Sequence, residues 1–203
     1  MQRILMILAL LMAWAGAARA ETAVLAGGCF WCVEANFESV PGVRDVVSGY
    51  AGGTAAKPTY RNHKGYYEAV KITFDPARVS YATILDLFLH STDVLDAGGQ
   101  FCDRGPAYRS AIFAKGAQQK AEAAAAVARA EAELGRKIVT PVLPATTFWK
   151  AEDAHQDYAR GAGTVLTRRG PMAQSDAYAF YRKACGRDRR VKALWGRRAE
   201  FLY

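Results

Sequence analysis

Residues 27–36 read Gly-Gly-Cys-Phe-Trp-Cys-Val-Glu-Ala-Asn. They follow a short apolar segment, residues 22–26, and open a run with helical spacing over residues 29–39. Glycine permits sharp backbone turns because it has no Cβ, so the order predicts a strand, a tight Gly-Gly turn and a helix. The chain therefore places a cysteine, Cys29, where a helix begins.

A thiol at a helix N-terminus faces free backbone N–H groups and the positive end of the helix dipole. Both favour an anion, so we expect a lowered pKa and a reactive thiolate at Cys29. Phe30 and Trp31 stand between Cys29 and Cys32, where redox and metal sites usually have smaller or polar residues. Two large rings beside the thiol predict an apolar ligand for its sulfur. A buried structural cysteine in a core helix is the alternative.

The remaining pattern mixes single strands and helices, without repeats or a low-complexity linker, and indicates a two-layer α+β or α/β domain. Ser80 is a plausible N-cap for the second predicted helix. Strands are predicted over residues 43–50, 68–74 and 108–114, helices over 81–90, 116–134 and 151–158, an extended segment over 138–148, and two short helical stretches in the C-terminal tail.

Length and composition fit one globular domain behind an export signal. The chain has 203 residues, of which 51% are hydrophobic and 23% charged. Arg3, an apolar run over residues 4–14 and Ala18-Arg19-Ala20 form the three parts of a secretory signal peptide. We expect residues 1–20 to be removed near Ala20, which leaves an exported, periplasmic or secreted domain over residues 21–203. An uncleaved membrane anchor is the alternative.

The formal net charge is +8, and much of the excess lies in a basic tail over residues 175–203. Basic clusters can bind nucleic acid or anionic membranes. Export disfavours nucleic acid as a partner, so we expect a solvated tail that packs through Leu194 and Trp195.

The four cysteines are Cys29, Cys32, Cys102 and Cys185. An even number in an exported protein is compatible with structural disulfides, in any of three pairings. A structural zinc site is not expected, because no second Cys-x-x-Cys or His-x-x-x-His completes a tetrahedral ligand set.

Several segments, in the same order along the chain, resemble the A-type peptide-methionine sulfoxide reductases. They are GCFWCVE at residues 28–34, GYAGG at 49–53, PTY at 58–60, YEAVKITFDP at 67–76, DRGPAYRS at 103–110 and AEDAHQ at 151–156. The resemblance implies a two-layer, ferredoxin-like α+β sandwich with a mixed sheet and an irregular C-terminal tail. It also implies an enzyme that needs no metal or organic cofactor.

The same resemblance assigns roles to single residues. It implies that Cys29 attacks the sulfoxide sulfur and that Phe30 and Trp31 form the wall around the substrate's S-methyl group. Glu68 matches the proton donor; desolvation at the start of an apolar strand would raise its pKa and keep it protonated. Tyr60 and Tyr108 match two tyrosines that hydrogen-bond the sulfoxide oxygen, and Asp103 matches a further polar residue near the site. His155 and Gln156 match residues with a structural support role.

In the implied cycle, the S epimer of methionine sulfoxide, free or in proteins, becomes methionine and Cys29 becomes a sulfenic acid. A second cysteine forms a disulfide with it, and an external dithiol, thioredoxin-like or another exported reductant, reduces this bond. We expect a monomer that repairs oxidised exported proteins.

The second cysteine is expected to be Cys185. It stands beside Gly186 in a charged tail that can move, and Lys183 and Arg187 should favour its thiolate. Cys32 and Cys102 remain alternatives. A bond from Cys29 to Cys32 within one helical turn would be strained, and Cys102, a further cysteine beside Phe101, could be a free buried thiol or a redox partner.

Two other classes of function compete with this interpretation. A thiol–disulfide oxidoreductase would use Cys29 and Cys32 alone, but it gives Glu68 no role. A non-enzymatic secreted module with two disulfides would leave no accessible thiol. Loss of two thiols per methionine formed would distinguish a reductase from both.

Overall fold

The computed structural model describes residues 19–203. Residues 1–18, which hold nearly all of the predicted signal peptide, lie outside the described residues. Within residues 19–203, no helix is both long enough and apolar enough to cross a membrane.

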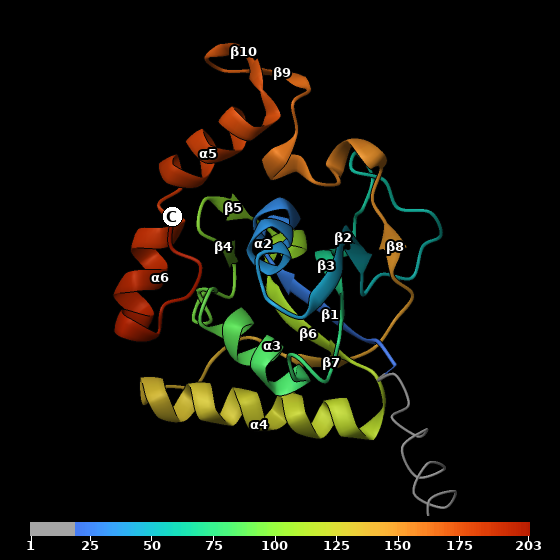
Figure 1. Cartoon of the computed structure of the whole chain (residues 1–203), viewed down its shortest axis with the longest axis vertical. Helices are drawn as coiled ribbons and strands as arrows, with labels where there is room; N and C mark the ends of the chain where they lie inside the picture. The colour runs from blue at the N-terminus through green and yellow to red at the C-terminus, as the bar shows by residue number, and fades with distance from the viewer. Residues whose placement is uncertain (1–18) are drawn as a thin grey trace, which may run out of the picture.

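A six-stranded sheet forms the centre of the molecule, in the order β7-β6-β1-β3-β2-β8 (Figure 1). Its four inner strands are mutually antiparallel, whereas the edge strand β7 runs parallel to β6. Chain order β-α-β-β-α-β with this strand order is the ferredoxin-like arrangement, so the predicted fold class is confirmed. The elements of this unit are β1 (Glu21–Gly27), α2 (Phe30–Glu38), β2 (Val43–Ala51), β3 (Tyr67–Phe74), α3 (Tyr81–Leu89) and β6 (Ser110–Ala114), and the edge strands are β7 (Val142–Pro144) and β8 (Trp149–Lys150).

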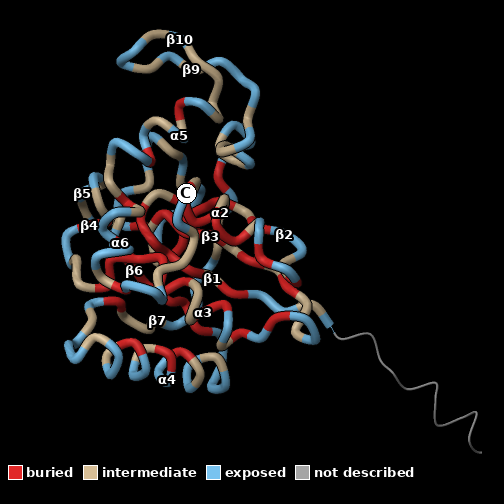
Figure 2. The backbone as a smooth tube through the Cα atoms, turned by 60° about the vertical axis from the view of Figure 1, so that its left-hand side comes forward, coloured by how far each residue is buried: buried red, intermediate tan, exposed pale blue. Residues whose placement is uncertain are grey.

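The two faces of the sheet are packed differently, because successive strand residues point to opposite faces. Leu25 and Val70 belong to the main core, which α2 and α3 supply with large apolar side chains such as Phe37 and Phe88. Their neighbours on the same strands belong to a smaller cluster that is rich in alanine. Burial is concentrated between the sheet and these helices (Figure 2). The larger core thus lies under α2, the helix that begins beside Cys29.

The helix α4 (Gly116–Leu134) has the predicted bounds and packs on α3 through buried alanines. It ends at Gly135, whose φ of +61° is the left-handed conformation that favours glycine. The Ser80 hydroxyl accepts a hydrogen bond from the Thr83 backbone N–H, as expected of an N-cap.

The predicted helix over residues 151–158 is wrong. The segment forms two short 3-10 turns, η3 (Asp153–His155) and η4 (Tyr158–Arg160). Gln156 is extended and Asp157 has a φ of +51°, so the backbone cannot continue as one helix.

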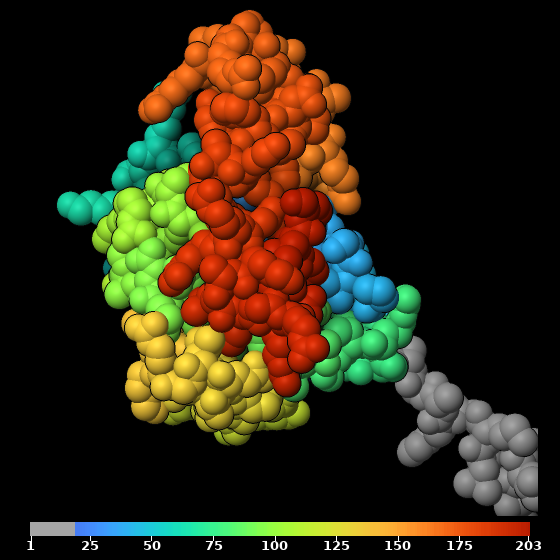
Figure 3. Space-filling view, turned by 90° about the vertical axis from the view of Figure 1, so that its left-hand side faces the viewer, coloured from blue at the N-terminus to red at the C-terminus, as the bar shows by residue number. Residues whose placement is uncertain are grey.

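The C-terminal region contains the two short helices that the sequence predicts, and it is more regular than the irregular tail that the resemblance implies. It consists of a hairpin, β9 (Thr164–Thr167) and β10 (Gly170–Ala173), followed by α5 (Gln174–Ala184), α6 (Arg187–Trp195) and the turn η5 (Gly196–Arg198). The hairpin projects from the molecule, and the helices cover a side of the sheet domain (Figure 3). Trp195 is buried and donates to the Thr92 carbonyl, so α6 is fixed to the core. A further small hairpin, β4 (Gly99–Gln100) and β5 (Asp103–Arg104), lies beside this region.

Candidate active site

Cys29 is the N-cap of α2, with non-helical backbone angles (φ −49°, ψ 115°). Its carbonyl accepts from the Cys32 N–H at 3.1 Å, which closes the first turn of the helix. The preceding Gly28 has a φ of +83°, and a Cβ at this position would lie 2.5 Å from the Cβ of Gln100. The tight turn therefore requires glycine, and it leaves the Cys29 thiol half-buried rather than covered.

The Cys29 and Cys32 thiols form a hydrogen-bonded pair. An N-cap side chain faces the third helical residue, which here is Cys32, so the backbone itself brings the two sulfurs together. The pair holds its proton on Cys29. The hydrogen bond to Cys32, then burial and the nearby Glu68 and Asp103, raises the pKa of Cys29.

The same hydrogen bond, with Arg187 and Arg182 nearby, lowers the pKa of Cys32 to about 6. The predicted lowering at Cys29 is thus corrected: the anion favoured in the resting pair is the Cys32 thiolate. Cys32 can take the proton from Cys29 when Cys29 attacks an electrophile.

Glu68 lies at the start of β3 and is 2% exposed. Its Oε2 accepts a hydrogen bond from the Phe30 N–H at 3.1 Å, while Oε1 is buried without a partner. Burial raises the pKa of Glu68 to about 8, which the bond from Phe30 opposes. This is the direction that the sequence predicted, and it keeps the carboxyl protonated near neutral pH, ready to donate to a ligand.

Three further candidate residues are half-buried near Cys29 and Glu68: Tyr60, Tyr108 and Asp103. The charges of Glu68, Cys29 and Asp103 act on both tyrosines. Burial is the main cause that raises the pKa of Tyr60 and raises that of Tyr108 to about 12. Both phenols therefore stay neutral and can donate hydrogen bonds. The structure thus brings five of the candidate site residues within range of one another's charges: Cys29, Glu68, Tyr60, Tyr108 and Asp103.

The two aromatic residues after Cys29 have different surroundings. Phe30 is 1% exposed and belongs to the core, whereas Trp31 is half-buried and lines a cavity. Tyr158 stacks on Trp31 with ring centroids 3.8 Å apart. His155 packs against Trp31 at 5.7 Å and against Tyr60 at 4.2 Å. The result is an aromatic wall on one side of the thiol.

His155 and Gln156 occupy the supporting positions that the sequence predicted. Gln156 binds both the N–H and the carbonyl of Ser48 at 3.0 Å, so it fixes the η3 turn to β2. Glu152 accepts from the Tyr60 N–H at 3.0 Å and thereby positions that tyrosine.

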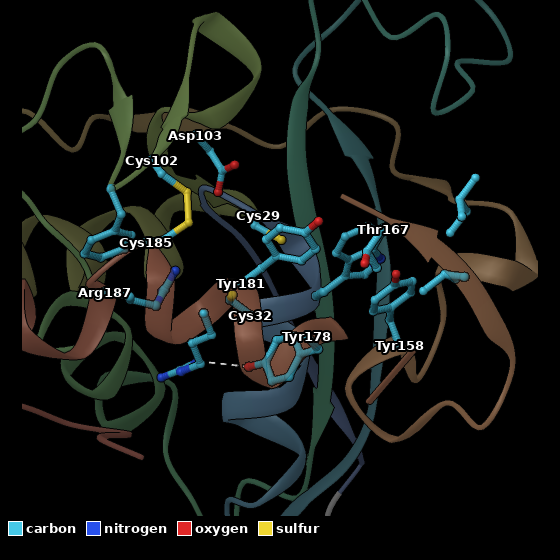
Figure 4. Close-up of a pocket in the computed structure, with 15 residues that line it drawn as sticks. Cys29, Cys32, Cys102, Asp103, Tyr158, Thr167, Tyr178, Tyr181, Cys185 and Arg187 are labelled. Carbon is cyan, nitrogen blue, oxygen red and sulfur yellow. Dashed lines mark hydrogen bonds between the residues drawn. A yellow bond between two sulfur atoms is a disulfide. The ribbon is translucent and has the colours of Figure 1, made fainter. Parts of the chain in front are cut away.

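A cavity of about 280 Å³ opens beside Cys29, with a mainly apolar lining (Figure 4). Residues from the C-terminal region that sequence reasoning missed form much of its wall. Tyr178 and Tyr181 stand three residues apart on α5, a spacing that puts both on one helix face and could have signalled their role. The other newly found residues are Tyr158, Val165, Leu166, Thr167, Arg182 and Arg187.

Cys102 and Cys185 line the same cavity and are joined by a disulfide, with Cα atoms 5.1 Å apart. Cys102 is thus not a free buried thiol. Cys185 is brought to the site, but its bond is to Cys102, and the thiol next to Cys29 is that of Cys32. Because Cys29 is the N-cap, its backbone is not helical. A bond from Cys29 to Cys32 would therefore not have to span a regular helical turn, which reduces the strain expected from the sequence.

The family model described as peptide methionine sulfoxide reductase matches residues 21–185. The chain belongs to the peptide methionine sulfoxide reductase family. It is 50% identical over 187 residues to "Peptide methionine sulfoxide reductase MsrA 2" of Rhizobium meliloti, with 91% of this chain and 88% of that protein covered. It is 40% identical over 185 residues to the MsrA of Halalkalibacterium halodurans, with 88% and 98% covered.

Solved structures of methionine sulfoxide reductases agree with the fold. Methionine sulfoxide reductase A of Corynebacterium diphtheriae superimposes with a TM-score of 0.67 at 30% identity, over 71% of this chain and 76% of that one. The reduced form of Mxr1 from Saccharomyces cerevisiae gives 0.66 at 27% identity, over 70% and 86%. In this methionine sulfoxide reductase the Cys29 end of α2 borders the cavity described above.

Proposed function

We propose that this protein reduces the S epimer of methionine sulfoxide, peptide-bound or free, to methionine through a sulfenic acid at Cys29. The observation that carries the proposal is the position of Glu68, a buried carboxyl with a raised pKa and one unpartnered oxygen. Its other oxygen accepts from the Phe30 N–H, and its charge acts on the Cys29 thiol. A sulfoxide is a poor electrophile until its oxygen is protonated, and Glu68 supplies that proton at neutral pH.

In the first step the Cys29 sulfur attacks the sulfoxide sulfur, and Cys32 takes the Cys29 proton. Glu68 protonates the oxygen, while the phenols of Tyr60 and Tyr108 donate hydrogen bonds to it. The oxygen passes to Cys29. Methionine leaves reduced by two electrons, and Cys29 is oxidised by two electrons to the sulfenic acid.

The aromatic wall around Trp31 receives the substrate's S-methyl group. Protonation makes the sulfoxide sulfur electron-poor, and aromatic faces attract a methyl group attached to such a sulfur. Cation–π and dispersion attraction of this kind contributes roughly 0.5–2 kcal/mol.

A second thiol then attacks the Cys29 sulfenic acid, which releases water and forms an intramolecular disulfide. Cys185 and Cys32 both line the cavity that would hold this reaction, and Cys32 is the nearer thiol in the described state. A thioredoxin-like dithiol reduces the enzyme again and becomes a disulfide itself.

We place this repair activity outside the cytoplasm, in a monomer that acts after cleavage near Ala20. The support is the order of Arg3, an apolar run and a small-residue cleavage site at the start of the chain. The reductant would then be an exported dithiol protein.

The proposal is tested with the fully reduced protein and separate S and R epimers of N-acetyl methionine sulfoxide. We expect methionine from the S epimer only, with loss of two protein thiols for each methionine until reductant is added. Cys29→Ser should form none, because a hydroxyl is a far weaker nucleophile near neutral pH. Thiol loss without methionine would favour a thiol–disulfide oxidoreductase instead.

A further inference from the structure

The outer wall of the cavity beside Cys29 is one strand of the projecting hairpin. Val165, Leu166 and Thr167 of β9 line the cavity, whereas its wall, over the residues that the structure describes, has no residue from β10. Consecutive strand residues point to opposite faces, so a wall made of three consecutive residues is an edge of the strand rather than a face of the sheet. Thr167 and Cys29 are drawn around the same opening in Figure 4. The edge of β9 therefore borders the cavity.

This edge has no strand partner within residues 19–203. β9 pairs with β10 in a two-stranded sheet, so its other edge is open. An open edge presents N–H and C=O groups that a further extended chain can bind. β10 contains Pro171, which has no N–H to donate, whereas β9 contains no proline. A complete row of backbone donors thus exists only along β9, the strand at the cavity.

The hairpin is held in place before any ligand arrives. At its base, the Gln174 N–H donates to the Gly163 carbonyl at 2.8 Å, which joins the hairpin to the start of α5. At its tip, the Arg169 guanidinium lies 4.8 Å from the centre of the Phe180 ring. A pre-organised edge loses little conformational entropy when it binds a ligand.

The side chains at this edge are apolar and exposed. Leu166 is 85% exposed, more than any other exposed large hydrophobic residue among the described ones. Tyr181 of α5 lines the same cavity and is 40% exposed. Contact of large apolar side chains with water is unfavourable, so two of them at the mouth of one cavity indicate a binding surface for an apolar group.

Tyr158 joins this surface to the thiol. It stacks on Trp31 with ring centroids 3.8 Å apart, and it lies within range of the charges of both Cys29 and Tyr181. The cavity volume of about 280 Å³ is close to the lower end of the roughly 300–1,000 Å³ that hold whole small ligands. The sulfoxide end of one methionine side chain is only part of such a ligand. Space therefore remains between the thiol and β9 for the chain that carries the sulfoxide.

We propose that the open edge of β9 binds the substrate polypeptide as an added strand, and that Leu166 and Tyr181 contact an apolar side chain next to its methionine sulfoxide. This inference rests on the proposed function and narrows its substrate class to extended, apolar segments of oxidised polypeptides. Hydrogen bonds to the main chain give affinity in this mode of recognition, and contacts to alternate side chains give selectivity.

A second copy of this chain is the competing occupant of an open edge. It would bring a second formal charge of +8 and a second Arg168-Arg169 tip to the first, and like charges repel. An apolar substrate segment carries no such charge. The position of the edge on the cavity beside Cys29 also favours the substrate, because a polypeptide bound there extends directly from the reacting side chain.

The test compares three substrates that carry the S epimer. They are N-acetyl methionine sulfoxide, a short peptide with valine on each side of a central methionine sulfoxide, and the same peptide with serine in place of valine. We expect the valine peptide to have the highest kcat/KM, at least about 10-fold above the N-acetyl compound. Equal kcat/KM for all three contradicts the inference and leaves the proposed function intact. No methionine from any of them contradicts the proposed function itself.

Pairing through the backbone is tested with N-methylated forms of the valine peptide. Neighbouring residues of a strand direct their N–H groups to opposite edges. Methylation of one alternate set of residues therefore removes the donors to β9, and methylation of the other set does not. We expect one pattern to raise KM by about 10-fold, with kcat little changed, and the other to have little effect. Equal KM values for the two patterns would show that no strand is added.

Leu166→Ser tests the apolar contact. Its matched control is Leu202→Ser, because Leu202 is also exposed, at 40%, but does not line the cavity. Leu166→Ser should lower kcat/KM for the valine peptide by about 5- to 10-fold relative to the N-acetyl compound. The loss should appear in KM, since a contact away from the reacting atoms stabilises ground and transition states equally. Leu202→Ser should leave this ratio unchanged.

Two results with Leu166→Ser would overturn the inference. One is a ratio of the two kcat/KM values that equals the parent's. The other is a parent dimer, seen by size-exclusion chromatography at the assay concentration, that Leu166→Ser converts to a monomer, because the edge would then belong to a second copy.

Discussion

Replacement of Glu68 by glutamine separates the chemical role of this carboxyl from its effect on stability. Glutamine keeps the shape and an oxygen that can accept from the Phe30 N–H, but it cannot donate an acidic proton. General acid catalysis typically contributes 10²–10⁴-fold. We therefore expect Glu68→Gln to slow single-turnover reduction by at least about 100-fold.

The effect on stability has the opposite sign. Burial raises the pKa of Glu68 from 4.5 to about 8. A carboxyl whose pKa is raised on folding costs stability as pH rises above its unfolded value, and the cost grows until the folded pKa is reached. At pH 7 it is about 3 kcal/mol, at 1.36 kcal/mol per pKa unit.

Glutamine removes this cost, but it buries an amide whose new N–H groups lack hydrogen-bond partners. Those unpaired groups destabilise the variant by about 1–3 kcal/mol. The variant should thus be as stable as the parent, or more stable by up to about 2 kcal/mol at pH 7. Relative to the parent, its stability should rise between pH 5 and pH 8, and near pH 4 the variant should be less stable by about 1–3 kcal/mol, because the protonated carboxyl then carries no cost.

The assay combines rapid-quench reduction of the S epimer with urea unfolding, both from pH 5 to pH 9. The reduction rate of the parent should fall above pH 8 as Glu68 ionises. This decrease in rate should be absent in Glu68→Gln. Glu34→Gln is the matched control, because burial also raises the pKa of Glu34, to about 7, but the charge of Glu34, unlike that of Glu68, does not act on Cys29. A variant slowed less than about 10-fold, or one that keeps the decrease in rate near pH 8, would refute the general-acid role.

Other expected outcomes follow from single contacts. Trp31→Ala should lower kcat/KM by about 10- to 30-fold, with little change in alkylation of Cys29 by iodoacetamide; equal losses in both assays would mean that Trp31 only supports the local fold. Gly28→Ala should destabilise the fold by at least about 1–2 kcal/mol in urea unfolding, because of its positive φ and the contact with Gln100; an unchanged midpoint would contradict this. In Cys185→Ser, one turnover should leave a Cys29–Cys32 disulfide in peptide maps, and a persistent Cys29 sulfenic acid would exclude Cys32 as its partner.

Local patterns in the sequence predicted the centre of the molecule well. The apolar strand, the Gly-Gly turn and the helix after Cys29 needed only nearest-neighbour information, and α4 was predicted from its alanines and Gly135. The raised pKa of Glu68 also followed from local sequence, since an acidic residue in an apolar strand must be desolvated.

Features that depend on distant pairing were missed. The β9–β10 hairpin has only four residues in each strand, and Leu166 in β9 is apolar but exposed. The strand therefore shows no alternation of apolar and polar residues in its sequence. The Cys102–Cys185 bond closes a separation of 83 residues, which no spacing rule connects. The pKa of Cys29 differs from the prediction because a helix N-terminus alone gives no information about the Cys32 thiol, whose hydrogen bond raises that pKa.

The central claim is tested most directly by thiol counting during a single turnover. Fully reduced protein is mixed with one equivalent of the S epimer of N-acetyl methionine sulfoxide, without reductant, and a parallel sample receives the R epimer. We expect one methionine and the loss of two thiols per chain with the S epimer, and neither with the R epimer. Equal reduction of both epimers, or methionine formation by Cys29→Ser, would contradict the account.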